Sequence, residues 1–281
     1  MVILFGIKYN VFSATVILRK LNILCIMKIK YYFVRFTLIW ISSVISYCGY
    51  SQSKYDHSIW DNLLKKHVTN NGKVVYQAMM EERDQLKIYL EYLSQHRPDP
   101  VKTARDVRLA FWINAYNAYT VDLILDHFPV SSINDIGPWL QIPFINSVFD
   151  QKHIILGGEK MSLNDIEHGI IRKEFEEPRI HFALVCAAIS CPPLRTEAYT
   201  AEKLDGQLQD QAFRFINDRE KNIIKKDHLQ ISRIFSWYKK DFTQQGTLVD
   251  FIDDYTEVDI STDARIDFLK YDWSLNEKEH P

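Results

Sequence analysis

The stretch IHFALVCAAISCPPLR, residues 180–195, carries the most structural information in this chain. Its first part is a short apolar run, so we predict a β-strand from Arg179 to Cys186. Its second part holds Ser190 and Cys191 and then two prolines, which stiffen a loop. The sequence therefore predicts a buried strand that delivers two cysteines to one end of the domain.

Alternation of side chains along such a strand separates His181 from Cys186. Residues an odd number of positions apart point to opposite faces of a strand. The two side chains are therefore not expected to pair as base and nucleophile, although Cys191, in the loop, could fold back toward either face. His153 and His168 are further candidates for a base acting on a cysteine.

Three interpretations of Cys186 and Cys191 remain open. They could form a disulfide, which an oxidising compartment would permit. One of them could be a free nucleophilic thiol, or both could be small buried apolar residues. The C-x4-C spacing is not one used for zinc, so we expect no metal. The sequence also has no P-loop or dinucleotide fingerprint, so we expect no cofactor.

A second informative stretch, FWINAYNAYTV, covers residues 111–121. Thr103 and Asp106 form a capping-box pattern in front of it, and apolar residues follow at helical spacing to Leu125. Asn114 and Asn117 lie within or beside the apolar stripe of this predicted helix. Buried amides need partners, so these two could satisfy the backbone of a neighbouring loop, or one could orient a catalytic group or donate to an oxyanion.

The remaining segments predict an α+β fold, with helices packed on a small, mostly antiparallel sheet in a single domain. Glycines at 157 and 158 indicate a hairpin within a strand region at 142–161, and a second hairpin is expected at 223–231. Further helices are predicted at 57–67, 81–95, 162–174, 200–218, around Trp237, 248–255 and 264–269.

Residues 1–51 are expected to be an export leader, with the signal peptide starting at Met27. Lys28, Lys30 and Arg35 precede an apolar run of about a dozen residues, short of the roughly 20 that span a bilayer. A membrane anchor made from the whole leader is the alternative. Residues 52–281 then form one domain.

The charge of that domain limits its partners. The leader has six basic and no acidic residues, which leaves 28 basic and 36 acidic ones and a net charge of −8. An acidic domain is a poor match for nucleic acid, whose phosphates need a basic face. We also expect no stable membrane insertion once the leader is removed.

Acidic residues give no clear acid–base pair. Asp241 and Asp272 lie among aromatic residues, where a carboxylate is expected to be partly buried. Asp241 could bind Arg195 or Arg233 as a structural ion pair.

Four motifs occur in order: FWINAYNAYTV, HFALVCAAISCPPLR, SRIFSWYKKDF and YDWSLNE. They resemble the family known as domain of unknown function 547, over about residues 108–277. This family occurs in exported bacterial proteins, and in plant proteins joined to coiled-coil or redox-type modules. The resemblance implies a shared fold and pocket but says little about substrate.

Carried onto this sequence, the family pattern places residues on the helix, around the cysteines and in the two later motifs. These are Phe111, Trp112, Asn114, Tyr116 and Asn117; Phe182, Cys186 and Pro192; Trp237, Asp241 and Phe242; and Asp272, Trp273 and Leu275.

We therefore expect a site in which Cys186 or Cys191 is the nucleophile, with His181 and Asn114 as catalytic partners. Asn117, Trp112, Tyr116, Ser190 and Asp241 are the expected binding residues. The hypothesis is an exported, periplasmic or secreted thiol-dependent hydrolase or acyl-transferase acting on a peptide-like substrate, with a small molecule or a peptide as its ligand. The alternative is a non-catalytic binding or scaffold domain of the cell envelope.

Overall fold

The computed structural model describes residues 55–137 and 147–278 of this chain, all within one compact unit, Ser53–Pro281. The predicted leader and the predicted strand region at 142–146 lie outside the described residues. The elements are α2 (Ser58–His67), α3 (Tyr76–Glu81), α4 (Arg83–Gln95), α5 (Arg105–His127), η1 (Ile133–Ile136), η2 (Val148–Asp150), β1 (Ile154–Leu156), β2 (Glu159–Met161), η3 (Asp165–Ile171), α6 (Arg172–Glu174), η4 (Pro178–Phe182), α7 (Leu204–Ile216), β3 (Ile223–Lys225), β4 (His228–Ile231), α8 (Ile234–Trp237), α9 (Lys239–Phe242), α10 (Leu248–Asp253) and β5 (Arg265–Phe268).

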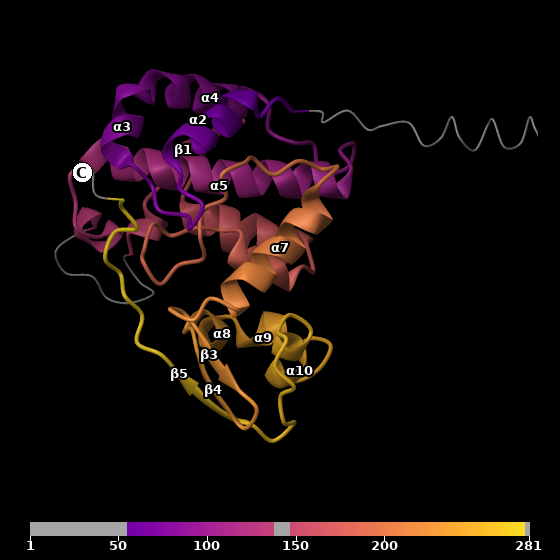
Figure 1. Cartoon of the computed structure of the whole chain (residues 1–281). Coiled ribbons are helices and arrows are strands. Elements are labelled where there is room, and N and C mark those ends of the chain that lie inside the picture. The colour runs from indigo at the N-terminus through magenta and orange to yellow at the C-terminus, as the bar shows by residue number, and fades with distance from the viewer. Residues whose placement is uncertain (1–54, 138–146, 279–281) are drawn as a thin grey trace, which may run out of the picture. The chain divides into compact units, whose positions relative to one another are not determined.

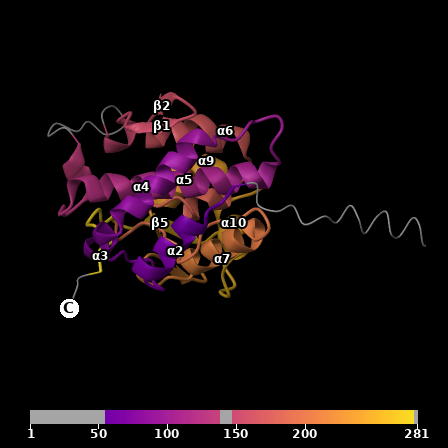
Figure 2. The same ribbon diagram turned by 90° about the horizontal axis from the view of Figure 1, so that it is seen from above.

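Helix α5 is the central element of the described fold. It lies against α2 and α4 on one side, and α7 runs from near it toward β3–β5 (Figures 1 and 2). Nearly every residue from Val107 to Leu125 is buried, so the helix is enclosed on all sides. The predicted helix is confirmed, but its predicted capping box is wrong: the N-cap is Ala104, and no side chain caps this end.

The strands form two small sheets within the described residues, and the predicted α+β class is confirmed. β1 and β2 form the expected antiparallel hairpin, whose turn places Gly157 and Gly158 at φ 60° and 80°. β3 and β4 form the second expected hairpin. The predicted helix at 264–269 is wrong, because this segment is β5, which pairs in parallel with β4.

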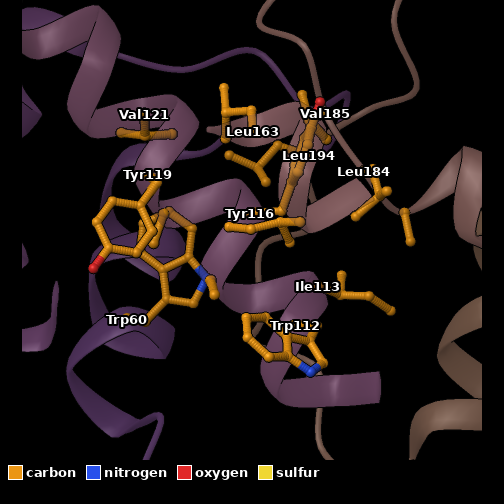
Figure 3. Packing of buried hydrophobic residues seen from close by; sticks show 14 of the residues in the cluster. Trp60, Trp112, Ile113, Tyr116, Tyr119, Val121, Leu163, Leu184, Val185 and Leu194 are labelled. Carbon is orange, nitrogen blue, oxygen red and sulfur yellow. The ribbon is translucent and has the colours of Figure 1, made fainter. Parts of the chain in front are cut away.

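Two hydrophobic clusters fill the interior. The larger one surrounds α5, where Trp112 and Tyr116 of the helix and Leu184 and Val185 of a loop belong to one packed set (Figure 3). The smaller one joins Phe182 to α7, β4, α9 and α10. Tyr271 packs against both clusters, which places it at their junction.

The predicted strand from Arg179 to Cys186 is wrong. Pro178–Phe182 is a short 3-10 helix with proline at its start, and turns follow it. The apolar residues of this stretch are divided between two cores: Ile180 is buried in the larger cluster and Phe182 in the smaller one. The strand-based separation of His181 from Cys186 therefore does not apply.

Several boundaries also differ from the prediction. The helix expected at 81–95 is α4, which begins at Arg83, and a further helix that was not predicted, α3, ends just before it at Glu81. α7 begins at Leu204 rather than Thr200. Ser162 and Asp165 do cap the next helix, with Asp165 N–H donating to Ser162 Oγ at 3.0 Å. Across residues 55–137 and 147–278, no helix has the length and apolarity that a membrane span requires.

Candidate functional site

Cys186 and Cys191 form a pair of free thiols. The Cys186 thiol donates to Cys191 Sγ across 2.9 Å, and the Cys186 backbone N–H donates to the same sulfur at 2.8 Å. Tyr271 Oη lies 3.2 Å from Cys186 Sγ. Cys191 is buried, whereas Cys186 is partly exposed. Of the three interpretations, the disulfide is not formed in this structure, and the sulfurs are adjacent and reduced.

The two thiols have opposite electrostatic tendencies. The hydrogen bond to Cys191, together with burial, raises the pKa of Cys186 well above its ordinary range. Burial opposes ionisation of Cys191, but the hydrogen bonds from Cys186 and the charge of Lys221 outweigh it and lower the pKa of Cys191. Lys221 is held nearby, since its Nζ donates to the Cys191 carbonyl at 2.8 Å. Cys191 is therefore the thiol that ionises first.

The loop between the two cysteines is held in place by contacts with the segment at 272–276. Asp272 N–H donates to Ser190 Oγ at 2.9 Å, and Ser190 N–H donates to the Asp272 carbonyl at 3.1 Å. Ala188 and Leu275 form an antiparallel bridge. Ala187 has φ +57°, an unfavourable conformation for a residue with a Cβ. Ser190, a predicted binding residue, thus holds the cysteine loop against the segment at 272–276.

Asn114 and Asn117 bind backbone groups of neighbouring loops. Asn114 donates to the Tyr199 carbonyl at 2.8 Å and accepts from Tyr199 N–H at 2.9 Å. Asn117 donates to the Ala183 carbonyl and accepts from Val185 N–H, both at 2.9 Å. The structural interpretation of these buried amides is confirmed.

His181 belongs to a separate buried array. Its Nε2 lies 2.8 Å from Asp241 Oδ2, and its ring stacks on Tyr238 with centroids 3.8 Å apart. Asp241 also receives two hydrogen bonds from Arg172, at 2.7 and 2.9 Å. Hydrogen bonds from His181 and Arg172 outweigh the desolvation of Asp241 and lower its pKa. The burial of His181 lowers its pKa in turn.

The predicted partners of Asp241 were wrong. Arg195 pairs with Glu197 and Asp210 instead, and Arg172 is the arginine that holds Asp241. An ion pair at Asp241 was expected, but with another arginine. Arg172 lies 69 positions before Asp241 and directly follows the π-helix η3.

Tyr116 and Tyr238 interact electrostatically with both Glu167 and Cys186. Burial raises the pKa of both phenols, and negative charge on Glu167 and Cys186 raises it further. Glu167 is buried on η3. Tyr116, a predicted binding residue, is thus close enough to the thiols for their charges to affect its phenol.

Other predicted residues are elsewhere. The Trp112 ring packs against Phe111 and beneath the Arg97 guanidinium. His153 Nδ1 bonds the Gln151 carbonyl, and His168 Nδ1 lies 3.1 Å from Arg172. Within residues 55–137 and 147–278, no histidine hydrogen-bonds to either sulfur.

Sequence reasoning missed Tyr271, Tyr238, Lys221, Glu167 and Arg172. The two tyrosines stand inside the motifs YDWSLNE and SRIFSWYKKDF, so the aromatic residues of those motifs were a usable signal. The other three carry no distinguishing pattern. In the part of the chain that is described, no group of three or more His, Cys, Asp or Glu side chains is arranged to hold a metal ion.

The fold and site thus define an α+β domain built around a buried helix and a pair of free thiols. Residues 100–216 match the family model described as "Protein of unknown function, DUF547". This match supports the resemblance read from the motifs, and it covers α5 and both cysteines. No curated protein and no solved structure matches this chain.

Proposed function

We propose that this protein is a thiol-dependent enzyme that exchanges disulfides with a peptide-like substrate. The observation that carries the proposal is the pairing of a partly exposed residue, Cys186, with a buried one, Cys191, whose sulfurs lie 2.9 Å apart. Thiol–disulfide exchange needs one sulfur to attack and a second to resolve the mixed disulfide. The unequal burial assigns those two roles.

In the first step, Cys191 as thiolate takes the proton of Cys186. Cys186 sulfur then attacks one sulfur of the substrate disulfide, forms a mixed disulfide and releases the other substrate sulfur as a thiolate, which is protonated by solvent. In the second step, Cys191 loses its proton to solvent and attacks Cys186 Sγ as a thiolate. The second substrate thiolate leaves, a Cys186–Cys191 disulfide remains, and the substrate has gained two electrons. Two molecules of a small thiol then reduce the Cys186–Cys191 disulfide to the two free thiols and leave as their own disulfide.

The test is a redox titration of the purified full chain in glutathione buffers, with peptide mass spectrometry to locate each thiol. We expect a reversible two-hydrogen loss at Cys186 and Cys191, with a potential between about −270 and −120 mV. Cys191→Ser should trap the mixed disulfide on Cys186, and Cys186→Ser should trap none. If both thiols stay unreacted until the protein is denatured, the scaffold alternative holds.

Acyl transfer, as hydrolysis or transfer to another acceptor, is the second candidate. Tyr271 Oη, 3.2 Å from Cys186 Sγ, is placed where a hydroxyl could donate to the oxyanion of a carbonyl attacked by Cys186. Disulfide exchange is favoured because it gives both sulfurs a role, one as the attacking and one as the resolving thiol. Acyl transfer needs only one nucleophilic sulfur, and no histidine within the described residues hydrogen-bonds to it.

The proposal includes the compartment in which the protein acts. A single domain at 52–281, exported through the predicted leader to a periplasmic or extracellular compartment, would meet cystine-containing polypeptides there. Its net negative charge argues against nucleic acid as a partner. Sequencing the N-terminus of the mature protein tests the export step, because an intact residue 27 contradicts it.

A further inference from the structure

We infer that Trp237, Tyr271 and Trp273, named here the aromatic ledge, bind an aromatic side chain next to a cystine of a polypeptide substrate. This inference rests on the proposed thiol–disulfide exchange and adds to it the class of substrate. The protein then recognises both the cystine that reacts and the residue next to it in the substrate.

The ledge is continuous with the thiol pair. Tyr271 touches Cys186 through its hydroxyl. The Tyr271 ring lies 4.8 Å from that of Trp237 and 4.7 Å from that of Trp273, measured between centroids. The two indoles are 6.0 Å apart and nearly parallel, at 28°. A continuous set of aromatic rings therefore begins at the sulfur of Cys186, a partly exposed residue.

Core packing does not account for the outer part of the ledge. Trp237 is 41% exposed, although it is the last residue of α8 and its helix neighbours Ile234 and Phe235 are buried. Tyr271 and Trp273 are only partly buried. An exposed indole beside a thiol pair gives a substrate a surface on which to stack.

Ring geometry favours a side chain over a flat cofactor as the occupant. Tyr271 is tilted by 51° and 52° to the two indoles, so the three rings do not form a parallel slot for a planar molecule. Tilted rings instead allow edge-to-face contact with an incoming phenylalanine, tyrosine or tryptophan. The contact between Tyr271 and Cys186 places that side chain next to the reacting cystine, within a residue or so along the peptide.

The experiment compares two cystine peptides that differ only at the residues flanking cysteine, aromatic in one and glycine in the other. We measure kcat/KM for their reduction by the full chain in the presence of a small thiol. We expect about a fivefold to tenfold preference for the aromatic peptide, which Trp237→Ala brings close to one. Phe213→Ala is the matched control, because Phe213 is 44% exposed on α7 and outside the ledge.

Absence of a preference in the unmodified chain, or an equal preference in Trp237→Ala, overturns the inference. A binding measurement separates it from the proposed reaction. Reduced aromatic peptide is titrated into Cys186→Ser, with and without Trp237→Ala. If neither peptide is reduced but binding still requires Trp237, the ledge stands and the exchange reaction fails. If binding is independent of Trp237, the ledge is overturned.

Discussion

The side-chain oxygen of Asn117 accepts a 2.9 Å hydrogen bond from the backbone N–H of Val185, the residue before Cys186. The same amide donates to the Ala183 carbonyl. The central helix thereby sets the path of the chain as it enters the thiol pair. Loss of this contact should be felt in stability and in the geometry of the cysteines.

Asn117→Ala should lower the free energy of unfolding by about 2–4 kcal/mol, because it leaves a buried N–H and a buried carbonyl without partners. Urea denaturation of the purified protein measures the change. Asn62→Ala is the control, since Asn62 is exposed on α2 and should change stability by less than about 0.5 kcal/mol. Equal effects at the two positions would contradict the structural role of Asn117.

Cys191→Ser should shift the alkylation of Cys186 to lower pH. In the unmodified protein the hydrogen bond to Cys191 is the largest cause of the raised pKa of Cys186. A serine hydroxyl does not ionise in this range and so does not hold the Cys186 proton in the same way. The measurement is the rate of iodoacetamide labelling against pH, located by mass spectrometry. A midpoint that stays in place after the substitution would show that burial, not Cys191, controls Cys186.

His57 should make the protein less stable in acid. Burial lowers the pKa of His57 to about 4, and its Nδ1 lies 2.7 Å from Tyr89 Oη. As pH falls below about 6.5 the unfolded chain binds a proton that the folded chain accepts only near pH 4. The free energy of unfolding should fall across that interval, by at most about 3 kcal/mol.

The check is denaturation at several pH values for the unmodified chain, for His57→Gln and for the control His96→Gln, whose side chain is exposed. In His57→Gln the free energy of unfolding should depend less on pH between 6.5 and 4 than it does in the unmodified chain. In His96→Gln the dependence should be unchanged. An unchanged slope in His57→Gln would assign the acid sensitivity to other groups.

Ala187→Gly should leave stability unchanged or raise it by up to about 1 kcal/mol, because glycine tolerates the positive φ at this position. Ala187→Val should destabilise the protein by more than about 2 kcal/mol, since a β-branched residue fits neither the backbone nor the buried site. Thermal unfolding reports both. Ala188→Gly is the comparison. It should lower the free energy of unfolding by about 1 kcal/mol, because Ala188 does not have a positive φ. Similar losses at both alanines would show that position 187 is unstrained.

Local sequence patterns predict the secondary structure of a segment correctly where the residues that it contacts are close in sequence. The α5 helix and both hairpins follow from periodicity and turn residues. The stretch from Arg179 to Cys186 could not be assigned that way, because a short apolar run reads alike as a strand or as a buried turn, and here its residues serve two cores. Likewise β5 depends on its pairing with β4, 37 positions away, as for His228 and Arg265.

The candidate site shows the same division. Its cysteines, asparagines and Asp241 stand in motifs and were predicted, whereas the bond from Arg172 to Asp241 joins residues 69 positions apart and leaves no mark on either local sequence. Glu167 lies on a helix whose pattern does not distinguish its buried carboxylate from an exposed one.

The pairing of Ser190 with Asp272 joins positions 82 residues apart, and this has a consequence for how the protein is made. A ribosome delivers both cysteines well before it delivers the segment that closes over their loop. During that interval the sulfurs belong to an unfinished chain, open to wrong pairing with other nascent thiols. The loop that carries the two thiols is therefore completed only when the segment at 272–276 reaches it.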